Sequence, residues 1–120
     1  MTIYRFHVSV FANPKSSSFA VTWEEAAVAL EQLPRMIFEP DGSFVVSGGV
    51  GSERWQVDGH LFDFAGRLHR LELHGECPTA AFDDLLRCVG WPAQSPLFEM
   101  VREGFTLDET TFRDRAKQND

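Results

Sequence analysis

The segment Asp63-Phe64-Ala65-Gly66-Arg67 lies between two runs of alternating polar and apolar residues, and it constrains the fold more than any other part of the chain. An Asp that opens a turn and a Gly three positions later favour a type I turn closed by a left-handed glycine. This is the three-residue loop of a β-hairpin with a bulge. The segment therefore predicts that residues 54–62 pair with residues 68–75 as antiparallel strands.

That turn also predicts the register of the hairpin. Because side chains alternate between the two faces of a strand, the register places nearly every apolar side chain on one face and leaves the other face polar. The expected opposite pairs are Trp55 and Gly75, Val57 and Leu73, Gly59 and Leu71, and Leu61 and His69 on the apolar face, and Gln56 and His74, Asp58 and Glu72, and His60 and Arg70 on the polar face.

The spacing of the apolar residues and the positions of the turn residues predict the remaining elements. They are a strand around Tyr4 to Val10, a helix capped by Thr22 and Glu25, two short strands over 36–39 and 43–46, a helix from Pro78 closed by Gly90, a short helix from Ser95-Pro96 to Gly104, and one more helix around Phe112 that Thr106 and Glu109 cap.

The order β-α-β-β-β-β-α-α predicts an α+β fold with two layers, an antiparallel five-stranded sheet with helices packed on one face. We expect a single domain over residues 1–120, because the chain has the commonest domain length and no linker divides it. After Phe105 the chain becomes polar, so we expect a frayed tail over about residues 113–120.

Charge and hydropathy exclude several classes of partner. The net charge of −7 argues against a nucleic-acid binder, which needs clustered Lys and Arg. The longest apolar stretch, residues 26–30, is far shorter than the roughly 20 residues that cross a bilayer, so we expect no membrane partner. Arg5 and His7 interrupt what would be the apolar part of a signal peptide, which favours a cytoplasmic protein.

Four polar side chains of the 54–75 hairpin, Asp58, His60, Glu72 and His74, are expected to project from adjacent strands to one side. Carboxylate and imidazole groups are the ligands of Zn²⁺ and related metals such as Mn²⁺. Like charges directly opposite each other, as expected for Asp58 and Glu72, disfavour pairing unless a cation lies nearby. Alternatively, Arg70 neutralises both carboxylates on an ordinary solvated face. We expect no cofactor, with Zn²⁺ or Mn²⁺ at these four residues as the alternative.

Cys77 is a candidate reactive thiol. It precedes a predicted helix, whose dipole lowers a thiol pKa, and His74 lies three residues upstream. No nucleophile signature surrounds it, so an inert buried cysteine is the alternative. Cys88 lies eleven residues further on, roughly 16 Å away along a helix, and both thiols are expected to be free.

The glycine-rich run of residues 47–52 resembles a phosphate cradle only in composition. It lacks a Gly-Lys-Ser/Thr ending and a following helix. We interpret it as a plain connection between strands.

The predicted hairpin of residues 36–46 carries large apolar side chains on both faces. One layer of helices covers only one face of a sheet, so the other should form an exposed interaction patch. The residues expected there are Met36, Phe38, Phe44 and Val46, with Phe11 and Phe62 nearby. A homodimer is the simplest use of such a patch.

These observations favour a small acidic protein that is not a catalyst and acts through protein–protein contact, either with itself or with a basic protein partner. The absence of a catalytic signature and the apolar strand faces support this hypothesis. The alternative is a metal- or ligand-binding protein, an enzyme included, that uses the polar face of the hairpin formed by residues 54–75.

Overall fold

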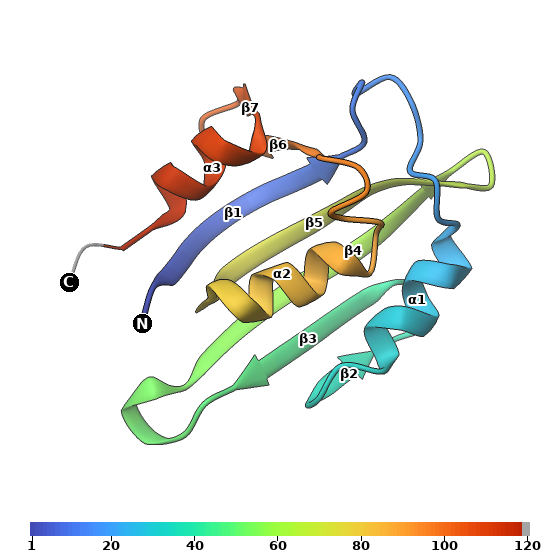
Figure 1. Ribbon diagram of the computed structural model, residues 1–120. Coiled ribbons are helices and arrows are strands. Elements are labelled where there is room, and N and C mark those ends of the chain that lie inside the picture. Colours follow the sequence, from blue (N-terminus) through green and yellow to red (C-terminus); the bar gives the residue numbers. More distant parts are fainter. Residues whose placement is uncertain (119–120) are drawn as a thin grey trace.

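The computed structural model describes residues 1–118, and in this part of the chain seven antiparallel strands form one sheet with three α-helices on one side (Figure 1). The strands are β1 (Ile3–Phe11), β2 (Met36–Phe38), β3 (Ser43–Gly48), β4 (Trp55–Phe64), β5 (Arg67–Pro78), β6 (Leu97–Met100) and β7 (Thr106–Leu107), and their order in the sheet is β2-β3-β4-β5-β1-β6-β7. The helices are α1 (Trp23–Glu31), α2 (Thr79–Arg87) and α3 (Glu109–Ala116). The α+β fold with an antiparallel sheet is confirmed, and the expectation of five strands is wrong.

Helix α1 begins at the predicted capping box. The Thr22 hydroxyl accepts a hydrogen bond from the Glu25 backbone N–H at 3.0 Å, and the Glu25 carboxylate accepts one from the Thr22 N–H at 2.9 Å. These bonds satisfy two of the free N–H groups of the first turn. The Trp23 indole N–H then donates to the Leu61 carbonyl at 3.2 Å, which ties the start of α1 to β4.

The segment after Pro96 is strand β6, where the sequence predicted a short helix. Leu97, Phe98 and Val101 have a helix-like spacing, but only four residues, Leu97–Met100, form the element. The physical reason is long-range: β6 pairs with the end of β1, placing Phe98 opposite Val10, and β7 pairs with β6 in turn. A pairing partner 88 residues away leaves no local signal in the sequence of β6.

The predicted helix around Phe112 is α3, and its N-cap is Asp108, whose side chain accepts from the Thr111 N–H. Phe112 is fully buried and stacks on Phe98 with ring centroids 4.4 Å apart. Lys117 then forms a β-bridge with Tyr4. Residues 113–116 of the expected frayed tail thus belong to α3 and Lys117 contacts β1, whereas residues 119–120 lie outside the described part.

The β4–β5 hairpin has the predicted faces but a different register. Ala65 and Gly66 both have positive φ, 53° and 78°, as in a two-residue type I′ turn, and a bulge interrupts the ladder between Phe62 and Asp63. The shift equals two residues, so the side chains of residues 55–61 and 71–75 keep their predicted faces. His69, expected on the apolar face opposite Leu61, lies at the bulge instead and turns to the other face, where its ring contacts Phe11. The observed pairs are Gln56 and Glu76, Val57 and Gly75, Asp58 and His74, Gly59 and Leu73, His60 and Glu72, Leu61 and Leu71, and Phe62 and Arg70.

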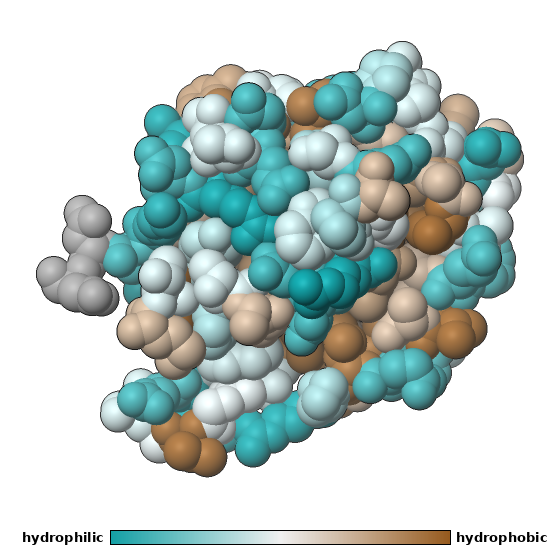
Figure 2. All heavy atoms as spheres, viewed as in Figure 1, coloured by the Kyte–Doolittle hydropathy of each residue, from teal (hydrophilic) through white to brown (hydrophobic). Residues whose placement is uncertain are grey.

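The core lies between the sheet and the helices. Val8 on β1, Val57 on β4 and Leu73 on β5 point to the helix side and are fully buried, with Leu30 of α1 and Phe82 of α2 packed in the same cluster. Figure 2 shows the outer side of this helix layer, where hydrophilic residues cover much of the surface around α2 and α3. The opposite face of the sheet carries no helix in the part of the chain that the structure describes.

Candidate functional site: the helix-free face of the sheet

The helix-free face consists of the side chains that alternate with the core residues along the strands. From β1, β5 and β4, which form its centre, come His7, Glu72, His74, Asp58 and His60. Its other members are Arg5, Ser9, Phe11, Lys15, Ile37, Ser43, Val45, Ser47, Gln56, Phe62, Phe64, Arg67, His69, Arg70, Glu76, Leu97, Glu99 and Thr106. All four histidines of the chain lie on this face.

The four predicted site residues come together at its centre. Asp58, His60, Glu72 and His74 line one shallow pocket of about 170 Å³, with His7 as a further wall. His7 was not predicted, because its place depends on β1 lying beside β5, and the alternation of β1 alone does not reveal that neighbour. In the sequence, His7 could be recognised only as a polar residue on the polar side of the alternating strand β1.

Each of these side chains already has a partner. His7 Nε2 lies 3.0 Å from Glu72 Oε2, and the His7 and His74 rings stack with centroids 4.1 Å apart. Asp58 accepts a hydrogen bond from the Gln56 amide at 3.0 Å. The His60 ring stacks on Phe62 with centroids 4.2 Å apart. Glu72 and Asp58 thus accept or share hydrogen bonds with their neighbours, whereas His60 and His74 contact theirs by ring stacking, and the side chains are not aimed at one point.

The predicted repulsion between Asp58 and Glu72 is absent, because the observed register separates them. Asp58 lies opposite His74 and Glu72 opposite His60, so that each carboxylate faces an imidazole. This removes the physical argument for a bound cation. Among residues 1–118, no group of three His, Cys, Asp or Glu side chains is disposed to hold a metal ion.

The predicted interaction patch does not lie on this face. Phe44 and Val46 are 3% and 4% exposed, and Met36 and Phe38 share their side of the sheet and pack against the same core. Helix α1 covers the face of the β2–β3 hairpin that the sequence predicted to be exposed. Ile37, which is 63% exposed, lies on the opposite, helix-free face. Of the nearby residues, Phe62 is on the helix-free face, and so is Phe11, which is 7% exposed because the Lys15 ammonium lies over its ring.

Cys77 lies in the core at the end of β5 and is free, as is the buried Cys88. Burial raises the pKa of the Cys77 thiol to about 12, and the Asp83 carboxylate acts in the same direction. The predicted effect of the helix dipole is outweighed by the loss of hydration. A thiol held in its neutral form is a poor nucleophile, so the burial of Cys77 argues against the reactive-thiol hypothesis and favours the inert alternative.

No helix in the described part of the chain has the length and apolar character needed to cross a bilayer. In comparisons with known proteins, no family model, no curated protein and no solved structure matches this chain. The functional argument therefore rests on the helix-free face itself.

Proposed function

We propose that this protein is a non-catalytic binding protein that self-associates through the helix-free face of its sheet. The observation that carries the proposal is the one-sided architecture, in which three helices pack on one face and the opposite face stays open in the described chain. Two such faces packed together form a sandwich of two sheets, the usual way in which a sheet covers its second side.

The distribution of charge favours a second copy as the occupant. The helix-free face carries four cationic side chains, Arg5, Lys15, Arg67 and Arg70, and four carboxylates, Asp58, Glu72, Glu76 and Glu99, so that its formal charge is 0 in a chain of net charge −7. Most of the negative charge therefore lies elsewhere, including pairs of acidic residues on each helix. Two acidic copies repel each other least when their nearly neutral faces meet.

The β2–β4 side of the face also offers apolar contacts. Val45 is half-buried between Ile37 and Asp58, and Phe62 carries the Arg70 guanidinium over its ring at 3.8 Å from the centroid. An apolar strip with balanced charges around it is the composition of a homodimer interface rather than of a surface for one strongly charged partner. A basic protein would find more complementary charge on the helix side.

Self-association is tested by sedimentation velocity and light scattering over a wide concentration range, for the wild type and two matched variants. Val45→Lys places a charge on β3, next to the centre of the helix-free face, and we expect it to weaken the dimer at least about tenfold. Val28→Lys makes the same change on α1, where Val28 is 62% exposed on the helix side, and should leave association unchanged.

A wild type that stays monomeric at every concentration would contradict the proposal. So would a dimer that Val28→Lys breaks and Val45→Lys leaves intact, because the interface would then lie on the helix side. Circular dichroism on both variants checks the fold. A lysine on the solvent side of a strand, opposite Asp58, is compatible with the sheet.

A further inference from the structure

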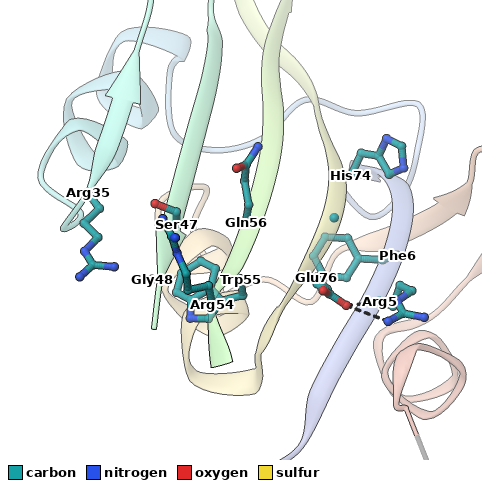
Figure 3. A pocket seen from close by; sticks show the side chains of 11 residues that line it. Arg5, Phe6, Arg35, Ser47, Gly48, Arg54, Trp55, Gln56, His74 and Glu76 are labelled. Atoms are coloured by element: carbon teal, nitrogen blue, oxygen red, sulfur yellow. Dashed lines mark hydrogen bonds and ion pairs between the residues drawn. The ribbon is translucent and has the colours of Figure 1, made fainter. Parts of the chain in front are cut away.

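A pocket of about 590 Å³ opens at one end of the sheet, where β4 begins and β5 runs toward α2 (Figure 3). Three arginines line it: Arg5 on β1, Arg35 in the turn after α1, and Arg54 just before β4. They come from three distant parts of the sequence. This volume is in the range of small-molecule sites.

The positive charge of this pocket is largely uncompensated. Glu76 is the one carboxylate among its lining residues, and the Arg5 guanidinium holds it at 2.9 Å. Arg35 donates to a backbone carbonyl and pairs with no carboxylate among residues 1–118. Within the same residues, Arg54 makes neither an ion pair nor a side-chain hydrogen bond. Two guanidiniums without a carboxylate partner in the described chain therefore meet at one pocket, although the chain carries a net charge of −7.

The glycine-rich loop fixes one of these arginines. Arg35 Nη1 donates to the Gly49 carbonyl at 2.9 Å, and Arg35 itself has a φ of 59°, a left-handed conformation that is uncommon outside glycine. Gly49 has a φ of 74°, and a Cβ there would collide with the Glu53 carbonyl. The loop therefore needs a glycine at this position to bring its backbone under the Arg35 side chain.

Further hydrogen-bonding groups complete the wall. Ser47 on β3, Gln56 on β4 and His74 on β5 line the pocket between the arginines. Figure 3 shows Arg35 and Arg54 on one side of it and the Arg5–Glu76 pair on the other. A second depression of about 410 Å³ shares Arg35, Ser47 and Arg54, so both guanidiniums are accessible from two sides.

From this geometry we propose that the pocket binds a small polar molecule through an oxyanion group, a phosphate or a carboxylate, with Arg54 and Arg35 as its main contacts. Guanidinium groups bind such oxyanions with two parallel N–H donors, and charge-assisted bonds of this kind are stronger than neutral ones. Ser47 and Gln56 are placed to bond the neutral part of the ligand. The pocket shares Arg5, Ser47, Gln56, His74 and Glu76 with the helix-free face, so it borders the proposed interface, and its test has to separate ligand binding from self-association.

The test is calorimetric titration with inorganic phosphate, pyrophosphate and citrate, with ¹⁵N-amide spectra recorded on the same samples. We expect saturable binding of at least one probe, with shifts confined to the glycine loop, residues 47–52, and the Trp55 indole. Stronger binding of pyrophosphate than of citrate identifies a phosphate ligand, and the reverse order identifies a carboxylate. Both results support an oxyanion site.

Variants separate recognition by these arginines from general charge attraction. Arg54→Gln should weaken binding at least about tenfold, and Arg54→Lys, which keeps the charge but loses the planar fork, should weaken it less. The matched control is Arg67→Gln, because Arg67 is equally exposed at the far tip of the β4–β5 hairpin. This control should bind each probe as the wild type does.

The proposal is overturned if no probe gives saturable heat up to about 10 mM, or if Arg67→Gln weakens binding as much as Arg54→Gln does. Ligand-induced changes in amide chemical shift at both ends of the sheet would also overturn the proposal. Repeating the titration in the Val45→Lys variant keeps the two proposals apart, because loss of the dimer with retained binding would leave the oxyanion site standing alone.

Discussion

Cys77 is the residue whose surroundings most change its chemistry. Burial and the nearby Asp83 raise the pKa of its thiol from the ordinary 9.0 to about 12, and burial with Asp84 raises the pKa of Cys88 to about 11. Both thiols therefore stay protonated in the folded protein at a pH where the unfolded chain already loses these protons. Above pH 9 the unfolded state binds fewer protons, so stability falls as pH rises.

This gives the first prediction. The free energy of unfolding, measured by urea denaturation under reducing conditions, should gain nothing from these thiols below pH 9 and should fall between pH 9 and 11. The slope is at most about 1.4 kcal/mol per pH unit for each thiol. The double variant Cys77→Ala, Cys88→Ala should lose this part of the slope. Rapid modification of either thiol in the folded protein at pH 8 would show that burial is not what controls them.

Residue types and their faces could be predicted from the sequence, but residue surroundings could not. The placement of Asp58, His60, Glu72 and His74 on one polar side followed from alternation alone and agrees with the structure. The burial of Cys77 depends instead on how α2 and β1 close over the end of β5, which no local pattern encodes.

For the β4–β5 hairpin, the sequence predicted the position of the turn but not its type. Ala65 occupies a position with φ of 53°, where an alanine side chain is strained and Asn or Gly is preferred. Asn-Gly is the favoured pair for a type I′ turn, and Gly66 already supplies the second residue.

We therefore predict that Ala65→Asn stabilises the protein by about 0.5 to 1 kcal/mol, measured as the free energy of unfolding in urea. Ala93→Asn is the matched control, since Ala93 is also exposed in a turn but is not among the residues with positive φ. It should change stability by less than about 0.5 kcal/mol. A loss of stability in Ala65→Asn would mean that the loop has the longer, three-residue form.

Elements fixed by local chemistry were predictable, and elements fixed by distant partners were not. The Thr22–Glu25 capping box needs four residues of sequence and is present as expected. Strand β6 exists because β1 offers it a partner. Helix α3 was predicted, but its anchoring by Arg113, which pairs with Asp83 at 2.8 Å and donates to the Tyr4 hydroxyl, was not. A polar stretch read alone gives no sign of such contacts.

At the scale of the whole molecule, charge is distributed unevenly. The helix side and the loops hold the net charge of −7, and the formal charges of the helix-free face cancel. Two copies that meet through this face still bring two acidic bodies together. Long-range repulsion therefore opposes self-association even when the contacts themselves are favourable.

Salt should reveal this repulsion. The screening length falls from about 30 Å at 0.01 M salt to about 8 Å at 0.15 M, which is short compared with the 42 Å length of the molecule. We predict that the dimer dissociation constant, measured by sedimentation, decreases several-fold between these two salt concentrations. An interface held mainly by ion pairs between copies, or a basic partner in place of a second copy, would respond in the opposite direction.

A charge variant tests the same cause without changing the solvent. Glu24 and Glu31 are exposed carboxylates on α1, on the side away from the proposed interface. Replacing both with Gln removes two negative charges per copy, so association at low salt should strengthen and its salt dependence should become shallower. Because neither residue lies on the helix-free face, such an effect has to act through space. If the double variant associates and responds to salt as the wild type does, repulsion between acidic bodies is not what limits the dimer.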